Sequence, residues 1–302
     1  MSFAIIGAEA EKRLDWIALT AAIEAGHRFP KAEVKDSLIY RGADTLLTRA
    51  AWIDGMGMAV KAGAVFPANP GKGKPTIHGA VNLFADEDGR LEAVLDFGLV
   101  TKWKTAGDSL LAARKLARPD SRRILLVGAG VVAASMVEAY SAAFPGAEFT
   151  VWTRRPESAR AFGARYGAAA VTDLEVAVRA ADIIATATMS TEPLIRGAWL
   201  KPGTHLDLIG AYTPAMREAD SDCFARASVF VDSRMTTIEH IGDLLEPIRE
   251  GVMTAADVRG DFYDIASGAF GRTHDDEITL CENGGGAHLD LMTARYILKA
   301  AS

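Results

Sequence analysis

The stretch that decides the fold is Ile124-Leu-Leu-Val-Gly-Ala-Gly-Val-Val-Ala133. Its apolar run is typical of a strand that is buried on both faces of a parallel sheet. Gly128, Ala129 and Gly130 then predict a tight turn, in which Gly130 lets the backbone approach a pyrophosphate. Ala133 stands where a small residue lets the following helix pack closely, and that helix offers free N–H groups at its start.

The residues that follow complete a βαβ unit. A helical stretch over 131–144 leads into Pro145-Gly146 and then into a second apolar strand at 148–152. A glycine turn of this kind also occurs for packing alone, which is the structural alternative. The complete unit favours a dinucleotide-binding turn.

Composition restricts the class of protein. The chain has 302 residues, a net charge of −6 and two cysteines, Cys223 and Cys281, that are far apart and without metal-type spacing. We therefore expect no metal site and no nucleic-acid partner. The N-terminus becomes charged too early for a signal peptide, and no apolar stretch approaches the ~18–20 residues of a membrane span. These features predict a cytoplasmic protein with no membrane partner.

The first part of the chain predicts a mixed α+β domain. We expect a helix over 8–28, another over 99–117, and a hairpin between the third and fourth of its strands, around Asp86–Gly89. The predicted strands are 44–51, 57–66, 76–84 and 91–96.

From residue 121 the pattern alternates between strands and helices. It predicts a doubly wound Rossmann sheet inserted into the mixed domain, so the fold class is α/β. We expect residues 1–118 to form a substrate-binding and dimerisation domain, completed by a last helix at 287–302, and residues 119–286 to form the NAD(P)-binding domain. The predicted strands of the second domain are 124–127, 148–152, 169–171, 182–186, 205–209, 229–232 and 278–283.

The end of the second Rossmann strand indicates the cofactor. An Asp or Glu there binds the 2′-hydroxyl of NAD, but this chain has Thr153-Arg154-Arg155. Guanidinium groups suit the 2′-phosphate of NADP, so NADPH is the expected cofactor, with NADH possible. The alternative is two solvated arginines at the start of a helix.

Three cations in the first domain are candidates for binding an anion. Arg49 and Lys61 each interrupt an apolar strand, and a buried charge needs a partner such as a carboxylate. Edge-strand charges that prevent aggregation are the alternative for both. Lys104, at the start of a helix, would on its own be taken as solvated, and His78 as an ordinary strand histidine.

Polar loops follow two strands at the carboxyl edge of the predicted sheet. Ile209–Pro214 follows one strand, and Thr186–Thr188 ends the preceding one. Ligands bind at this edge in open α/β sheets. The sequence contains no serine-hydrolase elbow, zincin helix, P-loop or Cys-x-x-Cys pair.

Together these pieces resemble the ornithine cyclodeaminase/mu-crystallin family over nearly the whole chain. The most specific marks are Val60-Lys61 with Phe66–Asn69, Thr101-x-x-Lys104-Thr105-Ala106, Leu116–Asp120 before the glycine turn, and Ile209–Pro214 with Arg217-Glu218. The resemblance implies an interrupted architecture, a homodimer formed through the N-terminal sheet, and a small imino or amino acid as substrate.

The resemblance also implies roles for individual positions. Lys61 matches the lysine that binds the substrate carboxylate, and Lys104 matches an arginine that touches both substrate and cofactor, so the charge is kept but the bidentate fork is lost. Gly284 matches a substrate contact. The positions implied for cofactor binding are Thr76, Lys104, Gly128, Ala129, Gly130, Val131, Val132, Thr153, Arg154, Arg155, Thr188, Ile209 and Asn283.

Tyr212 is where the sequence departs most from cyclodeaminases, which carry an aspartate there for the water-attack step. A tyrosine cannot be that base at neutral pH without a large pKa shift. What remains is hydride transfer to an imine, as in family members that reduce cyclic ketimines such as Δ1-pyrroline-2-carboxylate. Lys61 and Arg49 would hold the carboxylate, Lys104 would orient the substrate, and Tyr212 is one candidate acid besides solvent or a bound water.

Other readings remain open at this point. One is an ornithine cyclodeaminase or an enzyme like alanine dehydrogenase that makes acyclic amines from keto acids and ammonia. Another is a binding protein of the mu-crystallin kind, which holds NADPH and a carboxylate ligand. Ammonia dependence separates the first from a ketimine reductase, and turnover of an imine excludes the second.

Overall fold

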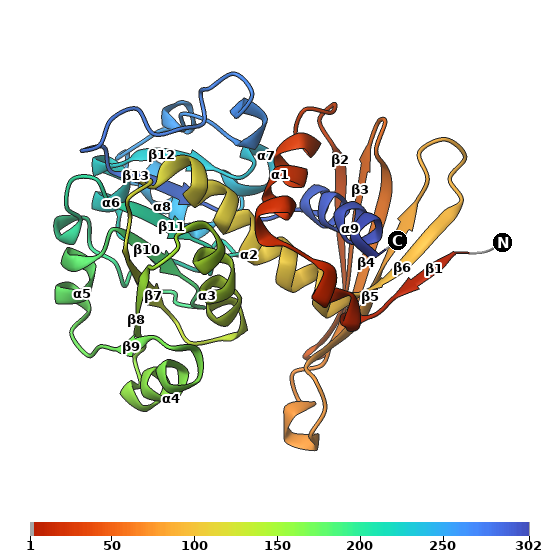
Figure 1. The fold of residues 1–302 in the computed structure, drawn as a ribbon, viewed down its shortest axis with the longest axis horizontal. Helices are drawn as coiled ribbons and strands as arrows, with labels where there is room; N and C mark the ends of the chain where they lie inside the picture. Colours follow the sequence, from red (N-terminus) through yellow and green to blue (C-terminus); the bar gives the residue numbers. More distant parts are fainter. Residues whose placement is uncertain (1–2, 302) are drawn as a thin grey trace. The chain divides into compact units, whose positions relative to one another are not determined.

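The computed structural model describes residues 3–301, which group into two compact units (Figure 1). One unit consists of the residues up to Lys104 together with those from Gly286 onward, and the other of Thr105–Gly285. The sequence placed the first boundary after residue 118. In the structure it falls inside one continuous helix, α2 (Phe97–Leu116), so composition gives no sign of it.

The first unit contains a six-stranded mixed sheet in the order β1-β6-β5-β4-β3-β2. Neighbouring strands are antiparallel except β1, which runs parallel to β6. The predicted hairpin is confirmed as β5 and β6, which pair on either side of the turn. The strands are β1 (Ala4–Ile6), β2 (Glu33–Arg41), β3 (Asp44–Ile53), β4 (Gly57–Val65), β5 (Ile77–Phe84) and β6 (Leu91–Asp96).

The sequence prediction missed β1 and β2. Strand β2 is exposed along nearly its whole length, so its sequence lacks the alternation of apolar and polar residues that marks a half-buried strand. The long helix predicted over 8–28 is also wrong. Ala8–Arg13 forms a short 3₁₀ helix, η1, and α1 (Trp16–Gly26) begins anew after Asp15, whose carboxylate accepts a 2.7 Å hydrogen bond from Ala18 N–H.

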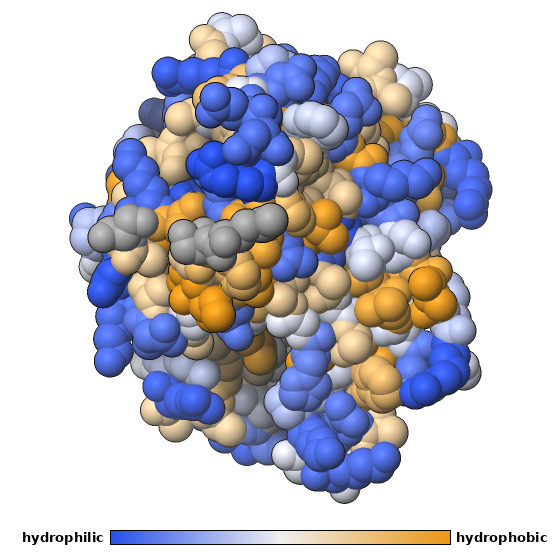
Figure 2. Space-filling model, turned by 90° about the vertical axis from the view of Figure 1, so that its right-hand side faces the viewer, coloured by the Kyte–Doolittle hydropathy of each residue, from blue (hydrophilic) through white to orange (hydrophobic). Residues whose placement is uncertain are grey.

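One face of this sheet is covered by the last helix, α9 (Ala287–Ala301), which packs against strands β2 to β5 and against α1. The opposite face carries half-exposed or exposed apolar side chains, including Ile5, Trp52 and Phe84. Figure 2, which faces the right-hand side of Figure 1, shows apolar side chains gathered in patches among hydrophilic ones. The first unit thus has one buried and one largely uncovered sheet face.

The second unit contains a seven-stranded parallel sheet in the order β12-β13-β11-β10-β7-β8-β9. This confirms the Rossmann prediction, and the strand order reverses between β7 and β10. The strands are β7 (Arg123–Val127), β8 (Glu148–Trp152), β9 (Ala169–Ala170), β10 (Ile183–Thr186), β11 (His205–Leu208), β12 (Ser228–Val231) and β13 (Thr279–Glu282).

Helices flank this sheet, with α3 on one side and α5 and α6 on the other (Figure 1). One apolar core lies between the sheet and the second group, around Leu206, Val229 and Phe224, and α3 buries Met136 and Tyr140 on its own side. The α-helices are α3 (Val131–Ala143), α4 (Pro156–Tyr166), α5 (Leu174–Ala180), α6 (Ser221–Arg226), α7 (Arg234–Thr237) and α8 (Gly242–Arg249). The remaining 3₁₀ helices are η2 (Pro70–Lys72) in the first unit and η3 (Gly197–Trp199), η4 (Ala255–Asp257) and η5 (Phe262–Asp264) in the second.

Within residues 3–301, no helix has both the length and the apolar character needed to cross a membrane.

Candidate active site

Two of the predicted cations lie side by side in the first unit. Arg49 of β3 and Lys61 of β4 are directly opposite each other in the antiparallel register, so their side chains share the face of the sheet that α9 covers. The Arg49 guanidinium pairs with Asp36 of β2 at 2.8 Å. The Lys61 ammonium, on a residue that is 6% exposed, pairs with Asp290 of α9 at 2.8 Å. The partners Asp36 and Asp290 were not predicted.

Lys104 joins this group. It is buried in the interior of α2, so the prediction that it opens a helix is wrong, because α2 begins seven residues earlier at Phe97. Burial lowers the pKa of Lys61, Asp290 raises it in part, and the positive charges of Lys104 and Arg49 lower it further. Lys104 and Arg49 are therefore close enough to Lys61 to disfavour its charge, and a bound carboxylate would favour that charge.

A histidine pair adjoins the cations. His288 of α9 is buried, and its ring meets that of His27 edge-on with centroids 5.6 Å apart. Burial, followed by His27, Lys104 and Arg49, holds the pKa of His288 well below its usual range. His288 is therefore neutral at pH 7. One signal in the sequence could have pointed to these residues: Asp290 and His288 are polar, whereas their neighbours Leu289 and Leu291 on the same helix are apolar.

Two other predicted residues of this unit make no described contact with Arg49, Lys61 or Lys104. Thr76 precedes β5, and its carbonyl accepts a hydrogen bond from the backbone N–H of Phe66. His78 is exposed in β5.

In the second unit, the glycine turn has the geometry that the sequence predicts. Gly128 has a φ of +118°, and a Cβ there would lie 2.6 Å from the carbonyl oxygen of Ala187, so only glycine fits. A Cβ on Gly130 would meet no atom within 4 Å, which leaves the backbone open to a ligand. Gly130 caps α3 without a side-chain hydrogen bond, and the first N–H groups of an α-helix have no partner within it. This cradle fits a pyrophosphate.

The ribose-reading position is polar and open. The hydroxyl of Thr153 donates a 2.6 Å hydrogen bond to the carbonyl of Arg155, which caps α4. Arg154 and Arg155 are both exposed. The structure therefore leaves two guanidinium groups accessible beside the position where an acid would select NAD.

Two loops at the carboxyl edge of the sheet are joined by Glu218. Its buried carboxylate accepts 2.7 Å hydrogen bonds from the backbone N–H groups of Thr188 and Gly210 and from the hydroxyls of Thr186 and Thr188. A Cβ on Gly210 would overlap the backbone of Thr188 and the Glu218 carboxylate, so the loops approach as closely as glycine allows. Burial raises the pKa of Glu218, and these hydrogen bonds partly offset that rise.

Asp243 of α8 holds Glu218 in turn. Its carboxylate accepts hydrogen bonds of 2.9–3.0 Å from the backbone N–H groups of Glu218 and Ala219. Burial, and next the nearby Glu218, raise the pKa of Asp243 to about 7. The sequence marked Arg217-Glu218 as a family motif but predicted no role for Glu218 and did not find Asp243.

The remaining predicted residues differ in accessibility. Tyr212 is 65% exposed on the loop after β11, whereas Asn283 is buried and its amide donates to Asp207 (2.7 Å) and to the Leu208 carbonyl (3.0 Å). Ile209 continues β11 by donating its N–H to Thr186. Gly284 packs tightly, because a Cβ there would lie 2.6 Å from the Thr237 hydroxyl.

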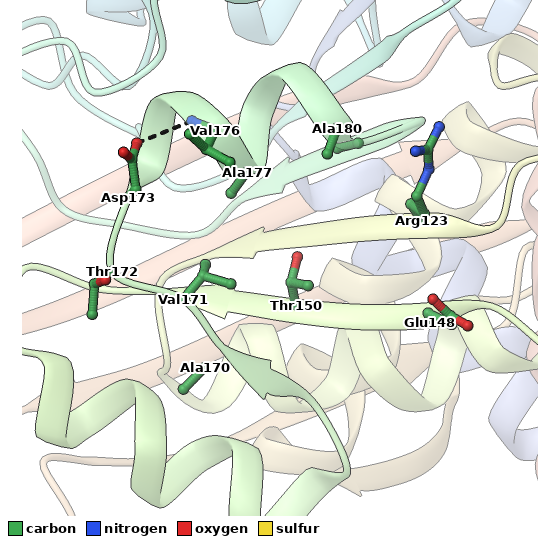
Figure 3. Close-up of a pocket in the computed structure, with 11 residues that line it drawn as sticks. Arg123, Glu148, Thr150, Ala170, Val171, Thr172, Asp173, Val176, Ala177 and Ala180 are labelled. Carbon is green, nitrogen blue, oxygen red and sulfur yellow. Dashed lines mark hydrogen bonds between the residues drawn. The ribbon is translucent and has the colours of Figure 1, made fainter.

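A pocket of about 460 Å³ in the same unit lies elsewhere (Figure 3). It lies between α5 and strands β7 to β9, with Thr150 pointing into it, Arg123 and Glu148 at one end and Asp173 at the other. None of the predicted site residues lines it. Among residues 3–301, no group of three or more His, Cys, Asp or Glu side chains is placed to hold a metal ion.

Comparison with known proteins agrees with the geometry. The model of the "Ornithine cyclodeaminase/mu-crystallin family" matches residues 49–302. This chain belongs to that family. The Δ1-pyrroline-2-carboxylate reductase of Paracoccus denitrificans is 50% identical over 298 residues, which cover 96% of this chain and 94% of that protein.

Solved structures of relatives carry the same fold. The Δ1-pyrroline-2-carboxylate reductase of Thermococcus litoralis, in complex with NADH and L-proline, superimposes with a TM-score of 0.88 at 26% identity, covering 99% of this chain and 97% of that one. An archaeal alanine dehydrogenase dimer with bound NAD gives a TM-score of 0.88 at 27% identity, covering 100% and 96%. The family and fold predicted from the sequence are therefore confirmed.

Proposed function

We propose that this protein reduces Δ1-pyrroline-2-carboxylate to L-proline, or its six-membered homologue to the corresponding cyclic amino acid, with a nicotinamide cofactor. The main support is the pair of sites described above: a group of cations, two of them buried and Arg49 partly exposed, suited to one carboxylate, and a glycine turn suited to a dinucleotide. The relative that is 50% identical over 96% of the chain acts on this substrate by name.

The chain's own residues position the substrate. Lys61 and Arg49 bind the carboxylate, and Lys104 adds positive charge beside them. NADH or NADPH, when bound, supplies the hydride that reduces the imine carbon. The C=N bond becomes a C–N single bond, and the proton on nitrogen comes from solvent, a water or the exposed phenol of Tyr212. The pyrophosphate would lie on the N–H groups of Val131 and Val132, and Thr188 would contact the cofactor.

Tyr212 argues against ornithine deamination. A phenol has no carboxylate oxygen with which to activate water. We therefore expect no ammonia release from L-ornithine. The exposed Arg154 and Arg155 support a preference for NADPH.

A homodimer belongs to the same proposal. The uncovered face of the six-stranded sheet is apolar, and exposed apolar faces of this kind are typical of subunit interfaces. The archaeal relative is a dimer by its description. The cytoplasmic location and the absence of membrane and nucleic-acid partners stay predictions from the sequence.

A substrate panel tests the proposal. NADPH and NADH oxidation would be followed with Δ1-pyrroline-2-carboxylate, with Δ1-piperideine-2-carboxylate, and with pyruvate plus ammonia or methylamine. We expect turnover of a cyclic imine without added ammonia. Turnover only with pyruvate and ammonia would favour an amino acid dehydrogenase instead, and cofactor binding without any turnover would favour a binding protein.

A further inference from the structure

An aromatic ring adjoins the cation that we assign to the substrate carboxylate. Phe97, the first residue of α2, places its ring over the Lys61 ammonium, with 4.7 Å between Nζ and the ring centroid. This distance is within the range of a cation–π contact. Asp290 contacts the same ammonium at 2.8 Å, so Lys61 has a carboxylate and an aromatic face as its neighbours.

Two glycines set the position of this ring. Gly63 of β4 and Gly79 of β5 are opposite each other in the register, one step beyond Lys61 along the same face. A Cβ on Gly63 would lie 2.8 Å from Cε2 of Phe97, and one on Gly79 would lie 2.7 Å from Cδ2. The ring therefore lies against bare backbone, closer to the sheet than any other residue type at these two positions would allow. It is only partly buried, so part of its surface can contact a ligand.

We propose that Phe97 is a specificity-determining residue, whose ring contacts the hydrocarbon part of a substrate held through its carboxylate by Lys61. This inference rests on the proposed function. A carboxylate oxygen about 2.8 Å from Nζ, on the side that the Phe97 ring flanks, brings the adjoining carbon atoms within a few ångströms of the ring. The ring favours methylene groups there. It disfavours a second carboxylate, which would lose hydration and meet the negative π face.

The substrate class follows from these contacts. The site takes a monocarboxylic imine whose other atoms form a small hydrocarbon ring, and it rejects imines of dicarboxylic acids. In this proposal Lys61 selects the carboxylate of the substrate, and Phe97 selects its hydrocarbon part.

The experiment compares ligands with and without a ring. Competition by pyrrole-2-carboxylate and by acetate would be measured for the unaltered protein, Phe97→Ala, Phe97→Leu and the control Phe29→Ala, an exposed phenylalanine of the same unit. We expect Phe97→Ala to weaken the binding of pyrrole-2-carboxylate about tenfold, because apolar contact is lost, and to change the binding of acetate by no more than about twofold. Phe97→Leu should restore most of the affinity. Gly63→Ala, which displaces the ring, should resemble Phe97→Ala.

Kinetics give a second readout. The KM for Δ1-pyrroline-2-carboxylate should rise in Phe97→Ala while kcat and the dissociation constant of NADH change little, which a general loss of folding would not produce. Equal weakening of both competitors, or of neither, would overturn the role of Phe97. Failure of the proposed function has a different signature: no turnover of either cyclic imine by the unaltered protein, whatever the effect of Phe97 on pyrrole-2-carboxylate.

Discussion

The carboxylate of Glu218 accepts a 2.7 Å hydrogen bond from the backbone N–H of Gly210 and, through its other oxygen, a second one from that of Thr188. One buried side chain thereby joins the loops that follow β10 and β11. Thr188 lies on the first loop and Tyr212 on the second, so Glu218 fixes the spacing between a proposed cofactor contact and the residue that departs from cyclodeaminases. The matching close approach of Gly210 to Thr188 supports this role.

Replacing Glu218 should therefore impair cofactor binding. In Glu218→Gln, an amide N–H₂ replaces one acceptor oxygen and faces a backbone N–H, which leaves a buried donor unpaired. Such a loss costs about 1–3 kcal/mol, so we expect the dissociation constant of NADH to rise roughly 2- to 13-fold when half of that cost falls on the bound state. Quenching of protein fluorescence by NADH measures it, with the exposed Glu239→Gln as control. Unchanged NADH binding in a folded Glu218→Gln protein would contradict this prediction.

Asp243 should make the stability of the protein depend on pH. Its folded pKa is about 7, whereas the ordinary value is 3.8, because burial and the nearby Glu218 disfavour the charged form. The folded state thus binds the proton more tightly than the unfolded state. The stabilising contribution of Asp243 to the free energy of unfolding is fully present below about pH 3.8 and is lost as the pH rises through about 7.

Urea unfolding at pH 5 and pH 8 tests this expectation. Asp243→Asn keeps a carbonyl oxygen for the N–H groups of Glu218 and Ala219 but cannot ionise. We expect the fall in unfolding free energy from pH 5 to pH 8 to be smaller in Asp243→Asn than in the unaltered protein. Glu157→Gln, which alters an exposed carboxylate of α4, should leave the fall unchanged. An identical pH dependence in all three proteins would refute the assignment.

Local patterns predicted most of the second unit. The apolar runs around Leu126 and Val151 and the glycine turn between them are short-range signals, and the structure places strands and a turn there. The first unit was harder, because β2 is an exposed edge strand and the 3₁₀ segment Ala8–Arg13 shares the composition of a helix. The helix that covers one face of its sheet is α9, which lies about 200 residues further along the sequence than the strands.

In the candidate site, too, the sequence revealed local signals but not long-range contacts. Single residues with unusual context, such as Lys61 in an apolar strand, could be found from the sequence. Their partners could not, because Asp290 lies 229 positions from Lys61 and the contact exists only in the folded chain. Glu218 and Asp243 were missed for a related reason: their importance lies in hydrogen bonds to backbone N–H groups, which leave no mark in the sequence.

Arg154 and Arg155 should determine the choice of cofactor. Both are exposed beside Thr153, where a 2′-phosphate would lie, and guanidinium groups bind phosphate through charge-assisted hydrogen bonds. We expect Arg154→Ala with Arg155→Ala to raise the KM for NADPH about tenfold and to leave that for NADH within about twofold. Steady-state kinetics at fixed salt measure both values. Equal effects on the two cofactors would show that the arginines do not read the 2′-phosphate.

The uncovered sheet face should form the dimer interface. Trp52 is half-exposed on this face in the single chain, and a buried tryptophan at an interface often contributes about 2 kcal/mol or more. Trp52→Glu should therefore weaken dimerisation about 30-fold or more. Sedimentation at several concentrations measures it. Val176→Glu, which places the same charge on an exposed apolar position of α5, is the control and should remain dimeric. A monomer in the unaltered protein would refute the interface.

The ion pair of Lys61 with Asp290 should set the pH range of substrate binding. Burial and the neighbouring cations lower the pKa of Lys61, and Asp290 raises it again. Asp290→Asn removes the compensating negative charge while its carbonyl oxygen can still accept the Lys61 hydrogen bond. The ammonium then loses its proton at a lower pH than in the unaltered protein, and a neutral amine no longer attracts the substrate carboxylate.

We therefore expect the KM for Δ1-pyrroline-2-carboxylate to begin rising at lower pH in Asp290→Asn than in the unaltered protein, while the KM for the cofactor keeps its pH dependence. Lys61→Met, which has no ionisable group there, should bind the substrate weakly at every pH, since the carboxylate loses its buried partner. The pH profiles of the three proteins, measured at constant ionic strength, separate these effects. A KM profile in Asp290→Asn that coincides with that of the unaltered protein would show that Asp290 does not control the charge of Lys61, and weak binding at all pH values would show that Asp290 acts only by holding Lys61 in place.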